Sequence, residues 1–265
     1  MRIPRPALIA PVIAAACASL ALLPAASATA TSHTAGFTNG AATPGLAAAH
    51  FGHAGGVAKA KVVAGKKGYN INGYNWSGAA ATGSGFSSVT STWTEPSVTC
   101  HSYNDLMAPW VGIDGYGSST VEQTGVATDC SSGAPVYQAW YEMYPASPVY
   151  YSLSSYPVGA GDRFTGTVTR SGTTYTLKLT DSTRGWTKTT TSSLSASNAS
   201  AEVIIESPSG SYPAFGTVSF SSSSINGSQL ANWNPTLMDA SSNGYYEDRT
   251  SAVSGGSFSI AYLHE

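Results

Sequence analysis

Charged residues are scarce in this chain: Asp, Glu, Lys and Arg together make up 10% of its 265 residues. A protein so poor in Lys and Arg lacks the basic surface that nucleic-acid binding requires. Histidine is also rare, because only two of the five, His101 and His264, follow residue 68. Two histidines without an HExxH motif make a poor transition-metal site, so we expect no metal ion and no other cofactor.

Several catalytic motifs are missing as well. The sequence contains no G-x-S-x-G motif, which frames the serine of many hydrolases, and no Asp-Thr-Gly or Asp-Ser-Gly motif of the pepsin type. It also lacks a phosphate-binding glycine loop. Acid–base chemistry therefore falls to carboxylates, assisted by neutral amides and tyrosines.

A long apolar run occurs only at the N-terminus. Two basic residues, Arg2 and Arg5, precede an apolar stretch that ends at Leu23, and the small residues Ala26–Ala30 follow. This is the pattern of a secretory signal peptide, which we assign to residues 1–30. No later run of 18 or more apolar residues is present, so we expect no membrane anchor and secretion into the extracellular space.

Acidic residues are absent from the first 68 residues, which hold 6 of the 12 Lys and Arg. Residues 69–265 hold the other 6 against 14 Asp and Glu, a formal charge of −8. We interpret residues 31–68 as a basic pro-segment that lies on an acidic body and is removed near Lys66 and Lys67. The alternative is a disordered linker. On either interpretation we expect residues 1–68 to be poorly packed.

Three cysteines are present, and Cys17 lies inside the predicted signal peptide. In an exported protein the remaining two, Cys100 and Cys130, most simply form a disulfide. That bridge closes a loop of about 31 residues and adds roughly 3–4 kcal/mol to stability on the chain-entropy estimate. It leaves no free thiol for catalysis.

Residues 69–265 are expected to form one domain, in which no segment shows a sustained helical period. Short alternating runs are separated by Gly, Ser, Pro and Asn, and Ser171-Gly172 indicates a hairpin with Tyr175, Leu177 and Leu179 on its core face. The pattern predicts an all-β fold, an antiparallel sandwich of two sheets. The expected strands are 86–93, 106–114, 120–126, 135–144, 164–170, 175–181, 201–206, 217–223, 236–240 and 258–263.

Polar side chains concentrate in the stretch Trp110–Gly125, which is typical of two short strands joined by a Gly/Ser turn. Glu122 and Gln123 are neighbours on the second strand and therefore point to opposite faces of the sheet. At most one of the two faces a given cleft.

A second pair of polar residues lies in the run AEVIIE at 201–206. Strand alternation places Glu202 and Glu206 on one face, with Ile204 between them. An apolar strand that carries two carboxylates favours burial of at least one, which raises its pKa. The alternative is that both are solvated charges at strand ends.

Five short motifs occur in one order at compatible spacings over residues 74–265, and together they resemble the glutamic peptidases, or eqolisins. The resemblance implies a lectin-like β-sandwich of two large antiparallel sheets, with the substrate cleft across one curved face. It also implies an endopeptidase that acts on polypeptides at acid pH. The motifs are N-W-S-G at 75–78, W-V-G-I-D-G at 110–115, E-Q-T-G at 122–125, A-W-Y-E-M-Y-P at 139–145 and A-E-V-I-I-E at 201–206.

The same resemblance implies roles for individual residues. Gln123 and Glu206 carry over as a catalytic dyad, and Glu202 as a neighbouring carboxylate without a catalytic role. Ionised Glu206 would act as general base on a water molecule, while the Gln123 amide would donate to the developing oxyanion. Positions that line or support the cleft carry over to Trp76, Trp110, Asp114, Trp140, Glu142 and Tyr144.

The chain departs from the family at Ala127 and Gln138, where fungal members have acidic residues. This difference affects the hydrogen bonds that support the site, and with them the pH optimum, but not the dyad. The expected partners are polypeptide substrates and the chain's own pro-segment as an inhibitor. We expect a monomer.

Two other functions fit the residues without the resemblance. A carbohydrate-binding β-sandwich would use some of the 15 Tyr and 6 Trp as stacking platforms and would need neither Gln123 nor Glu206. A glycosidase would pair two carboxylates, for example Glu142 and Glu206, at about 5–9.5 Å across a groove.

Overall fold

The computed structural model describes residues 40–49, 51, 69–241 and 245–263. All of them belong to one compact unit, Thr38–Glu265. The predicted signal peptide and the Lys66-Lys67 processing site lie outside the described residues. Within the described ranges, no helix has the length and apolar character needed to cross a membrane.

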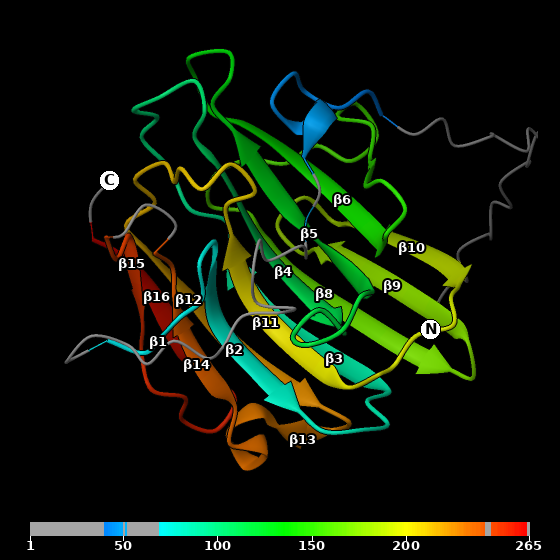
Figure 1. Cartoon of the computed structure of the whole chain (residues 1–265). Coiled ribbons are helices and arrows are strands. Elements are labelled where there is room, and N and C mark those ends of the chain that lie inside the picture. Colours follow the sequence, from blue (N-terminus) through cyan, green and yellow to red (C-terminus); the bar gives the residue numbers. More distant parts are fainter. Residues whose placement is uncertain (1–39, 50, 52–68, 242–244, 264–265) are drawn as a thin grey trace, which may run out of the picture. The chain divides into compact units, whose positions relative to one another are not determined.

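The described chain forms two β-sheets, and its only helices are the short 3-10 turns η1 (Leu46–Ala48) and η2 (Leu230–Trp233) (Figure 1). The first sheet has the order β1 (Ile71–Asn72), β14 (Thr236–Asp239), β2 (Trp76–Thr82), β11 (Ser200–Glu206), β4 (Leu106–Ile113), β5 (Val121–Asp129), β6 (Val136–Tyr144), β7 (Val149–Tyr150). The second has the order β10 (Trp186–Ser193), β9 (Thr174–Asp181), β8 (Arg163–Ser171), β3 (Ser88–Thr94), β12 (Thr217–Ile225), β16 (Phe258–Tyr262), β15 (Asp248–Thr250), and β13 (Ser228–Gln229) pairs with β12.

Neighbouring strands run antiparallel except at one edge, where β1 pairs in parallel with β14. The predicted two-sheet sandwich is therefore confirmed, with a first sheet that is mixed rather than purely antiparallel. The predicted hairpin is also present, and its two-residue turn is Gly172-Thr173, since Ser171 pairs with Thr174. Gly172 has φ +60°, a conformation that glycine adopts without strain.

The main core lies between the two sheets. Alternation along β9 buries Tyr175, Leu177 and Leu179 completely, as the sequence pattern predicts. They belong to one cluster with Val111 of β4 and Val203 of β11, from the opposite sheet. Inward-facing residues of both sheets thus close a single apolar layer.

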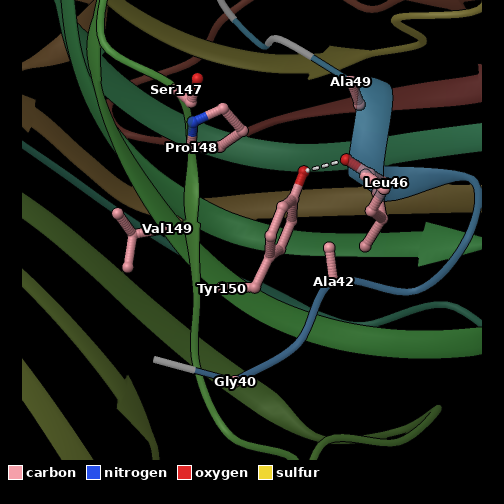
Figure 2. A pocket seen from close by; sticks show the side chains of 9 residues that line it. Gly40, Ala42, Leu46, Ala49, Ser147, Pro148, Val149 and Tyr150 are labelled. Atoms are coloured by element: carbon pink, nitrogen blue, oxygen red, sulfur yellow. Dashed lines mark hydrogen bonds between the residues drawn. The ribbon is translucent and has the colours of Figure 1, made fainter. Parts of the chain in front are cut away.

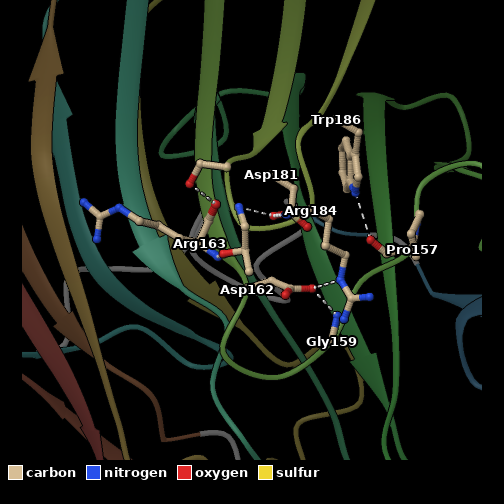
Figure 3. Close-up of polar contacts among 9 residues, drawn as sticks. Pro157, Gly159, Asp162, Arg163, Asp181, Arg184 and Trp186 are labelled. Atoms are coloured by element: carbon tan, nitrogen blue, oxygen red, sulfur yellow. Dashed lines mark hydrogen bonds and ion pairs between the residues drawn. The ribbon is translucent and has the colours of Figure 1, made fainter.

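A polar network fixes one end of the second sheet (Figure 3). Arg184, which follows β9, forms an ion pair with Asp162, which precedes β8. Asp162 also accepts the N–H of Gly159 at 2.6 Å, and the indole N–H of Trp186 donates to the carbonyl of Pro157 at 2.9 Å. These contacts hold the loop before β8 against the turn between β9 and β10.

The predicted disulfide between Cys100 and Cys130 is present, with a Cα–Cα distance of 5.7 Å. Cys130 directly follows the last residue of β5, Asp129. The bridge therefore fixes the end of a central strand of the first sheet to the loop that precedes β4.

The outer face of the first sheet, turned away from the second sheet, carries its own apolar cluster. Trp76, Trp110, Trp140 and Ile204 are fully buried there. Part of their cover comes from the described residues 40–49 and 51, of which Leu46 and Phe51 are also fully buried. The expectation of poor packing is wrong for Leu46 and Phe51, because their apolar side chains pack on the apolar outer face of the first sheet.

Candidate active site

Trp110 lies at the centre of the outer face of the first sheet. It pairs with Ile204 of β11 on one side and with Gly125 of β5 on the other, and Gly125 in turn pairs with Trp140 of β6. A Cβ atom at Gly125 would lie 2.2 Å from the Pro109 carbonyl and 2.7 Å from Cβ of Trp110. Only glycine therefore fits between the two indole-bearing strands.

Glu206 ends β11 and is fully buried on this face. Its Oε1 accepts a hydrogen bond from Asn75 Nδ2, and its Oε2 accepts one from Trp110 Nε1, each at 3.1 Å. Two N–H donors directed at one carboxyl group favour its charged form. The sequence left open whether Glu202 and Glu206 are solvated charges at a strand end; both are 0% exposed.

Gln123 points to the same face from β5, whereas Glu122 points between the sheets. The Gln123 Nε2 donates to Glu142 Oε2 at 3.1 Å. Its Oε1 is buried without a hydrogen-bond partner among the described residues. Because an amide nitrogen carries two hydrogens, one remains for another acceptor.

Glu142 accepts the hydrogen bond of Gln123 and also lies close enough to Glu206 for the two carboxyl groups to interact electrostatically. Burial raises the pKa of Glu142 to about 9, and the nearby charge of Glu206 contributes to the rise. Glu142 is therefore protonated throughout the acid range. It acts there as a neutral group that orients the amide of Gln123, not as a second negative charge.

The other two predicted acids take different positions. Burial raises the pKa of Glu202 well above its ordinary value, and its Oε1 accepts the N–H of Tyr116 at 3.3 Å. The carboxylate of Asp114 accepts the N–H groups of Asn198 at 2.6 Å and Ala199 at 2.8 Å. Asp114 thus holds the loop before β11, and its described contacts do not include the dyad.

The aromatic positions implied by the resemblance are all on this face. Trp76 packs edge-on against Trp110, with ring centroids 5.0 Å apart. Tyr144 ends β6 and is half-buried beside them. Besides Gln123 Oε1, five buried polar atoms at this face lack a partner among the described residues: Asn75 Oδ1, Trp76 Nε1, Gln138 Oε1, Trp140 Nε1 and Glu202 Oε2. Buried donors and acceptors of this kind suit a ligand with a polar backbone.

The stretch 40–51 lies on the edge of this face formed by β6 and β7. Gly40 donates its N–H to the Tyr150 carbonyl at 2.8 Å, and the Tyr150 hydroxyl donates to the Leu46 carbonyl at 3.1 Å (Figure 2). A cavity of about 230 Å³ remains between residues 40–49 and residues 147–150. Its lining is Gly40, Ala42, Leu46, Ala47, Ala49, Ser147, Pro148, Val149 and Tyr150.

Asp129 provides the strongest polar contacts of this stretch. Its carboxylate accepts the Thr43 hydroxyl and the N–H of Gly45, the latter at 2.9 Å. Gln138, one of the two departures from the family, donates Nε2 to the Ala41 carbonyl at 2.9 Å. Ala127, the other departure, is buried in the apolar cluster. Asp129 and Tyr150 could not be predicted from the sequence, because no local pattern marks them.

No group of three or more His, Cys, Asp and Glu is arranged to hold a metal ion within the ranges that the structure describes. The residues that meet on the outer face are instead one carboxylate held by N–H donors, one amide and two neutral carboxyl groups. This set can take a proton from water and donate a hydrogen bond to an oxyanion.

Comparison with known proteins gives a consistent result. The model of the Peptidase A4 family matches residues 74–262. Aspergillopepsin-2 of Aspergillus niger is 29% identical over 221 residues, 71% of this chain and 77% of that protein. Scytalido-glutamic peptidase, solved with a transition-state analogue inhibitor, has a TM-score of 0.63 at 28% identity over 72% of this chain and 98% of that chain. SCP-B, an eqolisin solved with the tripeptide Ala-Ile-His, has a TM-score of 0.60 at 26% identity over the same shares.

The family match covers every strand of the two sheets except β1 and all five motifs on which the resemblance was based, so the resemblance is confirmed. The outer face of the first sheet is the part of the fold that carries those motifs. The chain belongs to the peptidase A4 family and is a glutamic endopeptidase.

Proposed function

We propose that this endopeptidase cleaves polypeptides at acid pH, with Glu206 as the general base and Gln123 as the oxyanion donor. The observation that supports this most directly is the hydrogen bonding on the outer face. Glu206 is held by two N–H donors, and the amide of Gln123 is oriented by a neutral carboxyl group. Both side chains are buried on one face of the first sheet.

In this mechanism ionised Glu206 removes a proton from a water molecule as the water attacks the scissile carbonyl. The free N–H of Gln123 donates to the oxyanion of the tetrahedral intermediate, a preorganised dipole that acid does not remove. Glu206 then gives its proton to the leaving nitrogen. The mechanism requires one ionised carboxylate, which suits a pH of roughly 3–5, near carboxylate reference values.

Replacing Gln123 with Ala tests the oxyanion role. Loss of one oxyanion donor is expected to lower kcat by about 10²–10³-fold. Initial rates on an unfolded protein substrate, with a pepstatin-type inhibitor present, measure the effect free of contaminating aspartic peptidases. Gln229→Ala is the matched control, because Gln229 is exposed on β13. Full activity of Gln123→Ala would exclude the dyad.

We further propose that residues 31–68 form a pro-segment that inhibits the enzyme until it is removed, and that the signal peptide directs secretion. The support is the position of Phe51, which donates its N–H to Glu142 Oε2 at 2.9 Å, the oxygen that also accepts Gln123 Nε2. A segment in this position competes with any polypeptide that needs the same face.

Gly45→Val is expected to weaken this inhibition. A Cβ atom at Gly45 would lie 2.2 Å from Asp129 Oδ1, so a side chain there forces the segment away from its anchor. Overpacking of this kind costs about 1–3 kcal/mol, which corresponds to a rise of roughly 5- to 150-fold in the activity of the unprocessed chain. Ala47→Val, at an exposed position of the same segment, is the control. Equal latency in both variants would contradict the inhibitory role.

A further inference from the structure

Phe51 is the aromatic residue among the described residues 40–49 and 51, and its side chain is fully buried. Its ring stacks on the indole of Trp140, with centroids 4.0 Å apart and an interplanar angle of 22°. Stacked aromatic pairs gain energy from ring geometry in addition to the apolar area that they bury. The stacking of its ring on Trp140 therefore fixes the position of the Phe51 side chain.

The backbone of Phe51 is held at the same time. Its N–H donates to Glu142 Oε2 at 2.9 Å, and this same oxygen accepts Gln123 Nε2 at 3.1 Å. One carboxyl oxygen therefore joins the main chain at residue 51 to the proposed oxyanion donor. A polypeptide seated here presents an amide to Glu142 and a side chain to Trp140.

Trp140 is itself firmly placed. It is fully buried, and its strand pairs with β5 at Gly125. Its Nε1 has no hydrogen-bond partner among the described residues. A flat apolar ring beside an unused N–H donor is a surface built to receive an aromatic side chain with part of a peptide backbone.

We propose that Trp140 and Glu142 form a specificity subsite that selects an aromatic residue of the polypeptide substrate, and that Phe51 fills this subsite in the full chain. The proposal rests on the proposed function, since it assigns the subsite to the same face as the dyad. It identifies the preferred substrates as polypeptides with Phe, Tyr or Trp near the cleaved bond.

The test measures binding in the full chain with the Glu206→Gln substitution, so that no cleavage occurs. Phe51→Ala empties the subsite, and Phe51→Tyr keeps it filled as the matched control. Each chain is titrated by calorimetry with two blocked pentapeptides, Ala-Ala-Phe-Ala-Ala and penta-alanine. The Phe51→Ala chain is expected to bind the Phe peptide at least tenfold more tightly than penta-alanine, and the Phe51→Tyr chain is expected to show no such preference.

Trp140→Phe, added to the Phe51→Ala chain, keeps an aromatic ring in the core and is expected to reduce the preference. Equal binding of the two peptides to Phe51→Ala, or binding of neither, would overturn the subsite. A wild-type chain that cleaves no substrate at acid pH while the binding preference persists would instead overturn the proposed function. The two failures are thus distinguishable.

Discussion

Glu206→Gln is expected to lower kcat for peptide hydrolysis by about 10²–10⁴-fold, the range that a positioned general base contributes. Glutamine keeps the size of the side chain and can still accept a hydrogen bond from Trp110, but it cannot take a proton from water. Self-processing of the chain in acid should slow by the same factor. Gel densitometry of a digested protein substrate and of the enzyme's own size follows both reactions together.

Glu202→Gln is the matched control for this experiment. Glu202 is buried on the same strand face, and burial raises its pKa well above the ordinary value. It is therefore a neutral acid at low pH, and Gln imitates that form closely. Activity should remain within a few-fold of the wild type. Equal losses in the two variants would show that Glu206 acts through the structure of β11 and not through its proton.

Stability should fall as the pH rises from about 4.5 to about 8, which is the second large effect. Burial raises the pKa of Glu95 and Glu122, each from 4.5, and of Asp248, from 3.8, to about 8. At a pH between the ordinary pKa and the raised pKa, each of these carboxyl groups is protonated in the folded protein and ionised in the unfolded chain. The free energy of unfolding then decreases by up to about 1.4 kcal/mol per pH unit for each group. The stabilisation is complete only below the unfolded pKa.

Urea denaturation at pH 4, 6 and 8 measures this slope, provided that the m-value stays constant. Glu95→Gln removes one titrating group and should therefore reduce the fall of unfolding free energy with pH by the contribution of that group. The amide fits the site, because Trp93 and Thr128 can form hydrogen bonds with an amide as well as with a carboxylic acid. A midpoint that rises with pH would contradict the prediction. The expected profile suits an enzyme that works in acid.

Strand alternation was sufficient to predict which side chains share a face. It separated Gln123 from Glu122 and placed Glu202 with Glu206, and the structure agrees with both predictions. It could not predict that Glu206 is buried, because this depends on β11 lying between β2 and β4. Sheet order is a property of contacts between distant segments, which no local period encodes.

The expected strands did not include the central strand β2, Trp76–Thr82, whose small residues Ser, Gly and Ala resemble a loop, or the short strands β1, β7, β13 and β15. Two further elements were also not predicted, the strand β10 and the stretch that contains Leu46 and Phe51. β10, Trp186–Ser193, is an edge strand made almost entirely of Thr and Ser, and its composition resembles that of a loop. The stretch 40–51 has neither alternation nor charge, so nothing in it predicted burial of Leu46 and Phe51. Its conformation follows from the apolar face of the first sheet, on which it packs.

The two ends of the 52–68 connection are fixed to opposite edges of the first sheet. Phe51 lies on Trp140 of β6 at one side, and Ile71 pairs with Met238 of β14 at the other. If the proposed pro-segment inhibits, it does so as part of the same chain, so its effective concentration does not depend on how dilute the enzyme is. A single cut within the connection would make it an ordinary ligand, which dilution alone then removes.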